Sequence, residues 1–425
     1  MGQLSEYRVL VIGSGGREHA LVWALKRSPQ VGQIYVAPGN AGTQAVASNV
    51  PIRAEDTRAL VGFAREQRID LTIVGPETPL AAGVVDAFQA AGLRIFGPTQ
   101  AAAQLEASKA FAKDFMRRHH IPTAAYATFS DYEQALAYVR EQNCPLVVKA
   151  DGLAAGKGVL MCKTTAQAEN ALKQAMQDAA FGTAGAQVVI EEWLTGPELS
   201  VLAFSDGKTV AVMPPARDHK RACDDDKGPN TGGMGAYTPV PDASPDLIEQ
   251  VRRDILQPAI DGMAAEGRPY VGVLYAGLML TEDGVKVLEF NCRFGDPETQ
   301  VILPLLESDL LEIMLACVEG RLSEQPVQWQ AGACATVVLA APGYPGDYPK
   351  GLFISGLEQA EAQQNALVFH AGTDRINYQY ITASGRVLAV SGTGATLDDA
   401  LRTSYAAIRH IHFEGLYYRR DIGKQ

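Results

Sequence analysis

The residues best suited to chemistry lie in one short stretch, Lys286-Val-Leu-Glu-Phe-Asn-Cys-Arg-Phe-Gly-Asp-Pro-Glu298. Its centre alternates, so an extended strand would place Glu289, Asn291 and Arg293 on one face and apolar residues on the other. A carboxylate and an amide oxygen on one face suit Mg²⁺ or Mn²⁺, which keeps its other positions for water and substrate phosphates. Arg293 could hold anionic oxygens beside that metal. Alternation alone also describes an ordinary half-buried strand, so the prediction depends on the neighbouring motifs.

Composition narrows the class of protein. The chain has 425 residues, of which 47% are hydrophobic, and its length predicts about three domains. A formal net charge of -11 argues against a protein that coats nucleic acid or an anionic membrane. Six cysteines without a C-x-x-C pair or zinc-like spacing are interpreted as reduced core residues. With no signal-type segment and no run of 18 apolar residues, we expect a cytoplasmic, soluble protein. Small phosphorylated ligands remain possible, since local Lys and Arg clusters can bind them.

A glycine-rich turn follows the first expected strand, residues 8–13, and leads into a helix over 20–26. Backbone N–H groups at such a helix start suit a phosphate. The turn, Gly13-Ser-Gly-Gly-Arg-Glu-His19, differs from the dinucleotide fingerprint, because Glu18 stands where the third glycine belongs. The second strand, residues 33–40, also lacks the acid that would hold a ribose. The pattern favours a phosphate site over NAD, with a tight structural turn as the alternative.

The elements that follow predict a doubly wound sheet. Residues 70–77 and 93–98 read as further strands that end in glycine or proline, which places their loops at the ligand-binding edge of such a sheet. A helical segment is expected over 101–119, and Ile121-Pro122 ends it. We place the first domain boundary near residue 104.

A second glycine-rich segment, Gly152-Leu-Ala-Ala-Gly-Lys-Gly-Val159, follows a strand expected over 145–151. It is not a P-loop, because three residues separate Gly152 from Gly156 and Gly158 stands where Ser or Thr would hold Mg²⁺. We expect a flap over phosphates, with Lys149 on the strand and Lys157 in the loop. A flexible hairpin with two solvated lysines is the alternative.

Two further segments could contact a nucleotide or an anion. The strand at 187–194 can present backbone groups to an adenine edge, and Glu198 in the next turn can accept hydrogen bonds from ribose hydroxyls. A long loop is expected over 216–237, where Lys220, Arg221 and the glycine tract 231–235 suit anion binding better than disorder.

The remaining elements complete the plan of the chain. A helix over 247–266 precedes a strand over 272–280, which forms a hairpin with the opening stretch. From about residue 327 a separate α+β unit is expected. Its elements are strands over 335–340 and 386–391 and a helix over 397–411.

Together these motifs closely resemble the phosphoribosylamine–glycine ligase family, or glycinamide ribonucleotide synthetases, of the ATP-grasp superfamily. The motifs that carry the resemblance also include Ala37-Pro-Gly-Asn-Ala-Gly42, Val74-Gly-Pro-Glu77, Asp218-His-Lys-Arg221 and Gly228-Pro-Asn-Thr-Gly-Gly-Met-Gly-Ala236. The resemblance implies an N-terminal doubly wound parallel sheet, an ATP-grasp fold made of a small lid and a central domain, and a C-terminal α+β domain. The expected ranges are 1–104, a central helical segment at 105–123, the lid at 124–188, the rest of the central domain at 189–326, and 327–425.

The resemblance also implies roles for individual residues. Glu289 and Asn291 are expected to be the metal ligands, and Arg293, Lys149 and Lys220 the catalytic residues. The expected ATP contacts are Lys109, Lys149, Gly152, Gly156, Lys157, Gly158, Glu191, Leu194 and Glu198. The expected substrate contacts are Gly13, Gly15, Gly16, Arg17, Asn40, Glu77, Asp218, Lys220 and Arg293. Many superfamily members place a second acidic metal ligand on the adjacent strand, but residues 273–280 contain none.

The implied reaction ligates glycine to 5-phosphoribosylamine in purine biosynthesis, with ATP and Mg²⁺ or Mn²⁺ as cofactors and a glycyl phosphate intermediate. It needs positioning and electrostatics more than proton transfer, which fits the absence of an obvious Ser-His-Asp or Cys-His constellation. The alternatives are another ATP-grasp carboxylase or ligase and a nucleotide-sensing module without turnover. No nucleic acid or membrane partner is expected, and the oligomeric state is left open, a monomer included.

Overall fold

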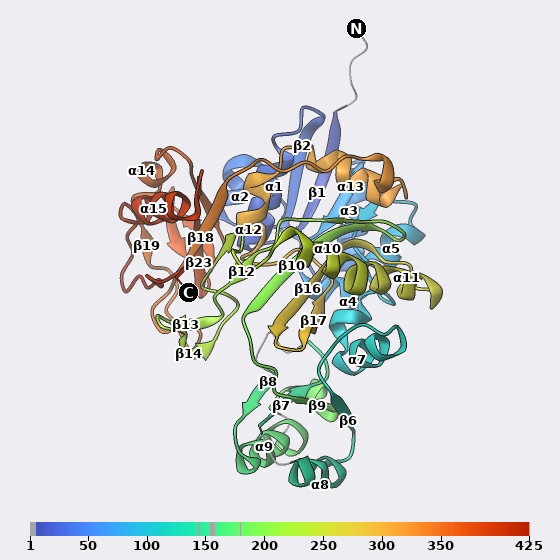
Figure 1. Cartoon of the computed structure of the whole chain (residues 1–425). Coiled ribbons are helices and arrows are strands. Elements are labelled where there is room, and N and C mark those ends of the chain that lie inside the picture. The colour runs from blue at the N-terminus through green and yellow to red at the C-terminus, as the bar shows by residue number, and fades with distance from the viewer. Residues whose placement is uncertain (1–5, 143–144, 154–157, 179, 425) are drawn as a thin grey trace.

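The architecture was obtained as a computed structural model, which describes residues 6–142, 145–153, 158–178 and 180–424. The N-terminal and central sheets are stacked on one another, the small lid projects below them, and the C-terminal domain lies to one side (Figure 1). The predicted fold class is therefore confirmed, and the site has to be sought where these parts meet.

The N-terminal sheet is parallel and has the strand order β3-β2-β1-β4-β5. Its strands are β1 (Tyr7–Gly13), β2 (Val31–Pro38), β3 (Ser48–Asn49), β4 (Leu71–Val74) and β5 (Ile95–Phe96). Its helices are α1 (Gly16–Leu25), α2 (Ala41–Val46), α3 (Thr57–Glu66), α4 (Glu77–Ala81) and α5 (Val84–Ala90). Val9 and Val11 pack into one hydrophobic core and Leu10 and Ile12 into another. Both faces of β1 are buried, as a doubly wound sheet requires.

The central sheet is antiparallel, with the order β11-β10-β16-β17. Its strands are β10 (Glu198–Asp206), β11 (Val210–Val212), β16 (Val271–Thr281) and β17 (Gly284–Asn291). The helical elements beside it are α6 (Gln104–Ala107), α7 (Lys109–Arg118), α10 (Pro245–Val251), a π-helical turn at Arg252–Leu256, and α11 (Gln257–Ala265). The helical segment expected over 101–119 consists of two helices, α6 and α7, because the chain turns extended at Ser108 and the Ser108 hydroxyl caps α7 by accepting the Phe111 N–H.

The lid has its own four-stranded sheet, in the order β6-β9-β7-β8. Its strands are β6 (Tyr126–Phe129), β7 (Leu146–Ala150), β8 (Val159–Cys162) and β9 (Val188–Glu192). Helices α8 (Tyr132–Gln142) and α9 (Thr165–Leu172) complete it. Val148, Leu172 and Ile190 belong to a core that contains only lid residues. The lid is therefore packed as a separate unit.

The segment expected as one long loop, 216–237, instead contains four short strands: β12 (Arg217–Asp218), β13 (Arg221–Cys223), β14 (Lys227–Asn230) and β15 (Gly235–Thr238). β13 and β14 form a hairpin. β12 and β15 join the C-terminal sheet, whose order is β12-β15-β18-β23-β20. Chain from the central domain thus forms the edge of the C-terminal sheet, a pairing that no local pattern predicts.

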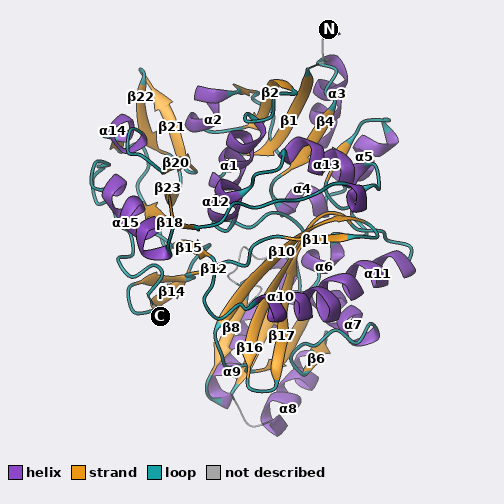
Figure 2. Cartoon of the chain, turned by 45° about the horizontal axis from the view of Figure 1, so that its top comes forward, coloured by secondary structure: helices purple, strands orange, loops and turns teal. Residues whose placement is uncertain are grey.

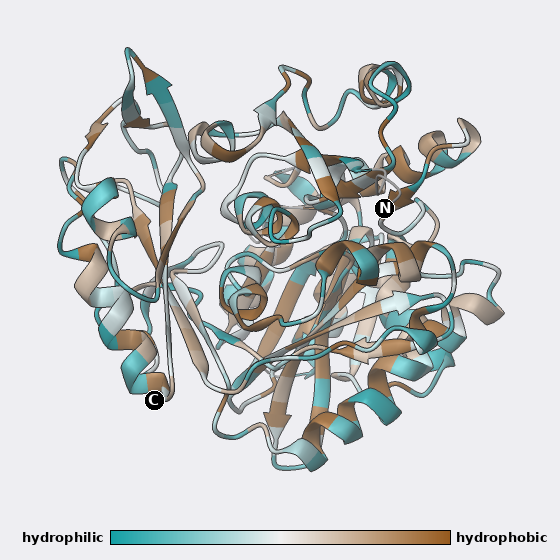
Figure 3. Cartoon of the chain, turned by 90° about the horizontal axis from the view of Figure 1, so that it is seen from above, coloured by the Kyte–Doolittle hydropathy of each residue, from teal (hydrophilic) through white to brown (hydrophobic). Residues whose placement is uncertain are grey.

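The C-terminal domain consists of that sheet, a smaller three-stranded sheet and two helices (Figure 2). Its own strands are β18 (Ala333–Ala340), β19 (Phe353–Ile354), β20 (Ala366–His370), β21 (Thr373–Ile376), β22 (Gln379–Thr382) and β23 (Arg386–Gly394), and its helices are α14 (Leu357–Glu361) and α15 (Leu397–Ile408). Helices α12 (Thr299–Ile302) and α13 (Leu310–Val318) precede it. Viewed from above, hydrophobic residues follow the strands and the inner faces of helices (Figure 3).

Four of the five cysteines that the structure describes agree with the sequence prediction. Cys162, Cys292, Cys317 and Cys334 are buried, whereas Cys223 is exposed on β13. The expectation of a core residue is wrong for Cys223, because the β13–β14 hairpin lies at the surface. Cys144 lies outside the described residues. Over the described part of the chain, no helix is both long enough and apolar enough to span a bilayer.

Candidate functional site

A cavity of about 550 Å³ lies where the N-terminal loops, the lid and the central sheet meet. Its polar lining includes Arg17, Glu77, Glu106, Lys109, Lys113, Lys149, Glu191, Glu198, Asp218, Lys220, Tyr275, Glu289, Asn291, Arg293, Asp296, Glu298 and Arg386. Its apolar lining includes Leu105, Met116, Val147, Leu194, Met279, Leu288 and Phe290. A cavity lined by apolar side chains together with many convergent charges suits a ligand with a flat ring and phosphates.

The predicted metal ligands lie near the C-terminal end of strand β17, in the hairpin β16–β17. Glu289 pairs with Gly277, and Asn291 pairs with Tyr275. The register of the two strands shifts between Val287 and Glu289. Strand β17 ends at Asn291, so Arg293 lies in the bend that follows and not on the strand, as the alternation had suggested. Arg293 still reaches the same face, because its Nη2 donates to Asn291 Oδ1 at 2.9 Å.

Glu289 and Asn291 offer donors that fit a hard divalent cation. Burial works to raise the pKa of Glu289, but Lys220, Lys149 and Lys109 outweigh burial and hold the pKa below its ordinary value. The Glu289 side chain is therefore an ionised carboxylate at neutral pH. The described residues contain no cluster of three or more His, Cys, Asp or Glu side chains that could enclose a metal. A cation here would keep positions open for water and phosphate oxygens.

Arg293 is held between two carboxylates. Its Nη2 lies 3.3 Å from Glu106 Oε1, and its Nε lies 3.5 Å from Glu77 Oε2. Burial raises the pKa of Glu106, whereas Arg293 and Arg17 overcome burial and lower the pKa of Glu77. The sequence prediction included Glu77 and missed Glu106, which also accepts the Cys292 N–H at 2.6 Å. Both carboxylates fix the guanidinium at the end of β17.

Three lysines lie between α7 and the lid. Lys109 Nζ donates to Gly152 O at 2.8 Å, which ties α7 to the start of the glycine-rich flap. The buried Glu191 carboxylate forms ion pairs with two of them: Oε2 lies 2.9 Å from Lys113 Nζ and Oε1 lies 2.8 Å from Lys149 Nζ. Lys113 was not predicted, although its i, i+4 spacing from Lys109 on a helix was a usable signal. The Glu191 carboxylate is thus engaged by two lysines.

A second polar cluster surrounds Lys220. Its Nζ lies 2.5 Å from Glu198 Oε2 and 4.0 Å from Asp218 Oδ1. Burial, reinforced by Glu298 and Glu198 and opposed by Lys220, raises the pKa of Asp218 to about 7. Glu298 Oε1 accepts the Tyr275 hydroxyl at 2.7 Å. Asp218 and Glu298 together give this side of the cavity an excess of carboxylate, which suits an ammonium group.

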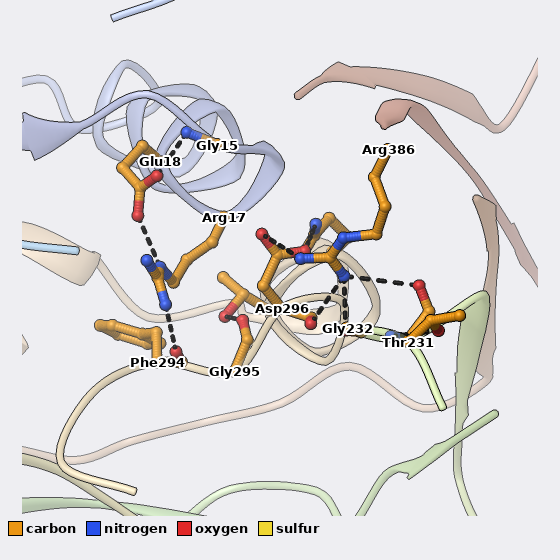
Figure 4. Close-up of polar contacts among 12 residues, drawn as sticks. Gly15, Arg17, Glu18, Thr231, Gly232, Phe294, Gly295, Asp296 and Arg386 are labelled. Carbon is orange, nitrogen blue, oxygen red and sulfur yellow. Dashed lines mark hydrogen bonds and ion pairs between the residues drawn. The ribbon is translucent and has the colours of Figure 1, made fainter. Parts of the chain in front are cut away.

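The glycine turn at the start of α1 is stabilised by Glu18, the residue that departs from the dinucleotide fingerprint. Glu18 Oε2 accepts the Gly15 N–H at 2.5 Å, and Oε1 accepts Arg17 Nε at 2.5 Å (Figure 4). A Cβ on Gly75 would lie 2.0 Å from Glu18 Oε1. The carboxylate therefore fills the space that a dinucleotide pyrophosphate would need. Arg17 extends past it to donate to Phe294 O at 3.2 Å.

Four predicted substrate contacts do not line the cavity, namely Gly13, Gly15, Gly16 and Asn40. Asn40 instead caps α2 by accepting the Gly42 and Thr43 N–H groups, and its Nδ2 donates to His370 O at 2.8 Å. Gly156 and Lys157 lie outside the described residues. The other predicted residues are brought together in one cavity.

Arg386 reaches the cavity from β23 of the C-terminal domain and was not predicted. Its Nη1 donates to Gly232 O at 2.6 Å and Asp296 O at 3.0 Å, and its Nη2 lies 3.3 Å from Asp296 Oδ2 (Figure 4). A Cβ on Gly232 would lie 3.1 Å from the Arg386 guanidinium carbon. Arg386 therefore joins the glycine tract after β14 to the loop that follows β17.

Comparison with protein families gives three matches. The models of the phosphoribosylglycinamide synthetase N domain, ATP-grasp (A) domain and C domain match residues 7–106, 107–299 and 334–425. The chain is 54% identical over 418 residues to a phosphoribosylamine–glycine ligase of Vibrio vulnificus, covering 98% of this chain and 97% of the relative. It is 55% identical over 420 residues to part of the trifunctional purine biosynthetic protein adenosine-3 of Gallus gallus, of which it covers 42%.

Solved structures agree with these matches. A phosphoribosylamine–glycine ligase from Thermotoga maritima superposes with a TM-score of 0.84 at 35% identity, covering 98% of this chain and 100% of that one. A biotin carboxylase from Campylobacter jejuni, at 14% identity and a TM-score of 0.74, shares the fold.

Proposed function

Because the chain belongs to the phosphoribosylglycinamide synthetase family, we propose how the residues that line its cavity carry out the family's reaction. The chain is an ATP-dependent ligase of purine biosynthesis that joins glycine to 5-phosphoribosylamine. The proposal assigns the steps of this reaction to particular side chains. We also propose that the enzyme is a cytoplasmic monomer and uses Mg²⁺ or Mn²⁺.

The chemical problem is that an amine does not displace hydroxide from a carboxylate at neutral pH. We assign the solution to an acyl phosphate, which forms when a glycine carboxylate oxygen attacks the γ-phosphorus of ATP and ADP leaves. The amine of phosphoribosylamine then attacks the glycyl carbonyl carbon, and inorganic phosphate leaves with one former carboxylate oxygen. Proximity and charge stabilisation supply most of the catalysis in such transfers.

The ATP end of the cavity is assigned from its apolar and cationic lining. Leu194, Met279 and Leu288 supply a slot for the adenine ring. Glu198 has one carboxylate oxygen engaged by Lys220 and a second with which to accept ribose hydroxyls. Lys109 and Lys149 lie where phosphate oxygens would meet them, close enough to Glu289 to lower its pKa. These lysines offset the negative charge of the triphosphate.

Glu289 and Asn291 would hold the divalent cation, which when bound neutralises charge shared by the β- and γ-phosphate oxygens. The Asn291 amide oxygen is oriented by its hydrogen bond from Arg293 at 2.9 Å. Asn291 thus connects the metal ligands to the residue that we assign to the glycine carboxylate. Gly277, opposite Glu289, leaves this part of the cavity open to phosphate oxygens.

Glycine is assigned to the space between Arg293 and the carboxylates Asp218 and Glu298. The guanidinium can grip both carboxylate oxygens of glycine, and the opposing carboxylates can accept hydrogen bonds from its ammonium group. Glycine carries both a carboxylate and an ammonium group, so one molecule can pair with Arg293 and with the opposing carboxylates at the same time. Phosphoribosylamine is assigned to the Arg17, Asp296 and Arg386 side, next to the glycine turn.

The acyl phosphate must be kept from water until the amine arrives. The lid supplies Val147, Leu153 and Val159 to the cavity lining, so its closure would remove water from the reacting groups. This requirement explains the presence of a separately packed lid.

The observation that carries the proposal is the adjacency of Glu289, Asn291 and Arg293, with Lys109 and Lys149 close enough to lower the pKa of Glu289. A carboxylase with the same fold would need bicarbonate, and a sensor would not need this arrangement. We test it with glycine labelled with heavy oxygen in its carboxylate. Inorganic phosphate should acquire one labelled oxygen per turnover, and only when phosphoribosylamine is present. Unlabelled phosphate formed together with product at a normal rate would rule out the acyl phosphate.

A further inference from the structure

A second cleft, of about 1120 Å³, lies beside the cavity between the lid, the β13–β14 hairpin and the C-terminal domain. We refer to it as the side cleft. Its lining includes Lys163 from the lid, Arg221 from β13, and Lys350 and Asp347 from the C-terminal domain. We propose that the side cleft is the access route by which the phosphorylated amine substrate reaches the site, with Lys163, Arg221 and Lys350 attracting its phosphate. This inference depends on the proposed function.

The first argument is the charge of the lining. Within the described residues, no carboxylate lies within 4.0 Å of the charged nitrogens of Lys163, Arg221 or Lys350, whereas Asp347 is the one carboxylate in the lining. Arg221 donates to a backbone oxygen, that of Gly228, at 3.0 Å. Three uncompensated cations against one carboxylate give this cleft a positive potential.

The three aspartates of the nearby hairpin do not cancel that charge, because each is engaged away from the cleft. Asp224 accepts the Arg420 N–H, Asp225 pairs with Lys227, and Asp226 pairs with Arg419. None of the three lines the side cleft. Arg419 is itself buried beneath the hairpin.

The second argument is the contrast with the whole chain. A protein with a formal net charge of -11 repels an anionic substrate at long range. A cleft lined by one sign of charge concentrates field lines and raises the local concentration of a counter-charged ligand, which increases association rates by about 10- to 1000-fold. On a protein whose net charge is negative, a positively charged cleft would therefore speed the association of a phosphate monoester substrate.

The third argument is where the side cleft leads. It shares Asn230, Thr231, Gly232 and Arg386, together with Val159 and Met161 of the lid, with the main cavity. Arg386 pairs with Asp296, and a Cβ on Gly15 would lie 3.3 Å from Asp296 Oδ2. Through Arg386 the cleft therefore reaches the glycine-turn side of the site, which we assigned to phosphoribosylamine; Figure 4 shows Arg386 and Asp296 beside this turn.

The dimensions and remaining lining suit a sugar phosphate. Trp193, Tyr344 and Tyr348 lie along the cleft with Gln167. Aromatic faces and an amide can contact the apolar face and hydroxyls of a ribose without fixing it in one orientation. Weak contacts of this kind allow passage, whereas a tight site would trap the substrate.

The test measures how the rate depends on ionic strength in a variant whose three cleft cations are replaced by neutral side chains, Lys163→Gln/Arg221→Gln/Lys350→Gln. The matched control, Lys26→Gln/Lys208→Gln/Arg409→Gln, removes three exposed cations that lie outside the side cleft. ADP formation is followed with phosphoribosylamine generated from ribose 5-phosphate and ammonia. In about 20 mM salt the first variant should lose about 10-fold in kcat/KM for the amine, and in about 500 mM salt less than about twofold. The control should stay within about twofold of wild type in both, as should KM for ATP and glycine.

Because Arg221 also supports the hairpin backbone, Lys163→Gln/Lys350→Gln provides a second variant whose altered side chains have no hydrogen bond among the described residues. It should show a smaller loss with the same salt dependence. As a readout without turnover, ribose 5-phosphate should change the tryptophan fluorescence of wild type, and Trp193→Phe should remove that change.

Wild-type kinetics for either variant in low salt would overturn the access route, as would a loss that salt does not reduce. An equal rise in KM for ATP would assign the cleft to the nucleotide instead. If wild type released ADP without requiring glycine and the amine, the proposed function itself would fail, which is a separate result.

Discussion

The burial and charge of Lys113 lead to a prediction about the stability of the fold and its dependence on pH. Its side chain is 2% exposed, and its Nζ lies 2.9 Å from Glu191 Oε2. Glu191 is shared with Lys149 at 2.8 Å, so two ammonium groups surround one carboxylate. Burial, only partly offset by Glu191, lowers the pKa of Lys113 from 10.5 to about 8. The group is therefore less easily charged in the folded chain than in the unfolded chain.

The magnitude and its sign follow from that difference. A fall of about 2.5 pKa units corresponds to about 3 kcal/mol by which the charged lysine destabilises the fold below pH 8, relative to a neutral side chain. Between about pH 8 and 10.5 the unfolded chain binds this proton and the folded chain does not, so stability rises with pH in that window. From pH 7 to 9.5 the gain from Lys113 alone is about 2 kcal/mol.

Lys113→Met removes the titrating group while keeping most of its length and leaves Glu191 paired with Lys149. Thr123 loses the hydrogen bond that it accepts from Lys113 at 2.7 Å, which costs about 1 kcal/mol, but it still donates to Val287 O. At pH 7 we expect the variant to be as stable as wild type or up to about 2 kcal/mol more stable, because about 3 kcal/mol of charge burial is removed.

The assay is urea unfolding of both proteins at pH 7 and pH 9.5, and the quantity of interest is the difference between their free energies of unfolding. Taking the difference cancels the other groups that titrate. The exposed Lys173→Met controls for the loss of one positive charge. Between pH 7 and pH 9.5 the free energy of unfolding of wild type should increase by about 2 kcal/mol relative to that of the variant. A difference that stays constant across this range would refute the argument.

Other predictions concern the reaction. Glu289→Gln should keep the fold but lose at least about 100-fold in kcat and require far more metal, as a metal titration would measure; normal activity at ordinary metal concentration would remove Glu289 from the site. KM for glycine should fall as pH rises through about 7, because Asp218 then ionises and can hold the ammonium, and Asp218→Asn should abolish that pH dependence. Arg386→Gln should raise KM for phosphoribosylamine about 10-fold with little change in KM for ATP, whereas equal effects on both would mean a purely structural role.

The local elements of the fold could be predicted because their signals are local. The strand and glycine turn at 8–19, the hairpin that carries Glu289 and the lid strand that carries Lys149 each have a clear period and clear turn residues. The extent of β17 was overestimated, because alternation continues to Phe294 while hydrogen bonding stops at Asn291. The alternation of residues in the sequence predicts which face of a strand each side chain occupies, but it does not predict where hydrogen bonding to the neighbouring strand ends.

The residues that were missed depend on contacts between distant segments. Glu106 and Lys113 are ordinary helix residues until α6 and α7 pack beside β17 and β9. Arg386 is separated from Gly232 by 154 residues. The departure at Glu18 was visible in the sequence, but its consequence was not: its carboxylate occupies the turn because both Gly13 and Gly75 lack a side chain.

The same long-range pairing decides which part of the molecule can move. β12 and β15 are hydrogen-bonded into the C-terminal sheet, and the chain between them, including Lys220 and Thr231, lines the cavity. A rotation of the C-terminal domain would therefore break sheet hydrogen bonds and displace the site itself. The lid sheet, by contrast, consists only of strands within 126–192 in the described part of the chain. We infer that closure over an acyl phosphate comes from the lid, which would carry Lys149 with it while Glu289, Asn291 and Arg293 stay in place.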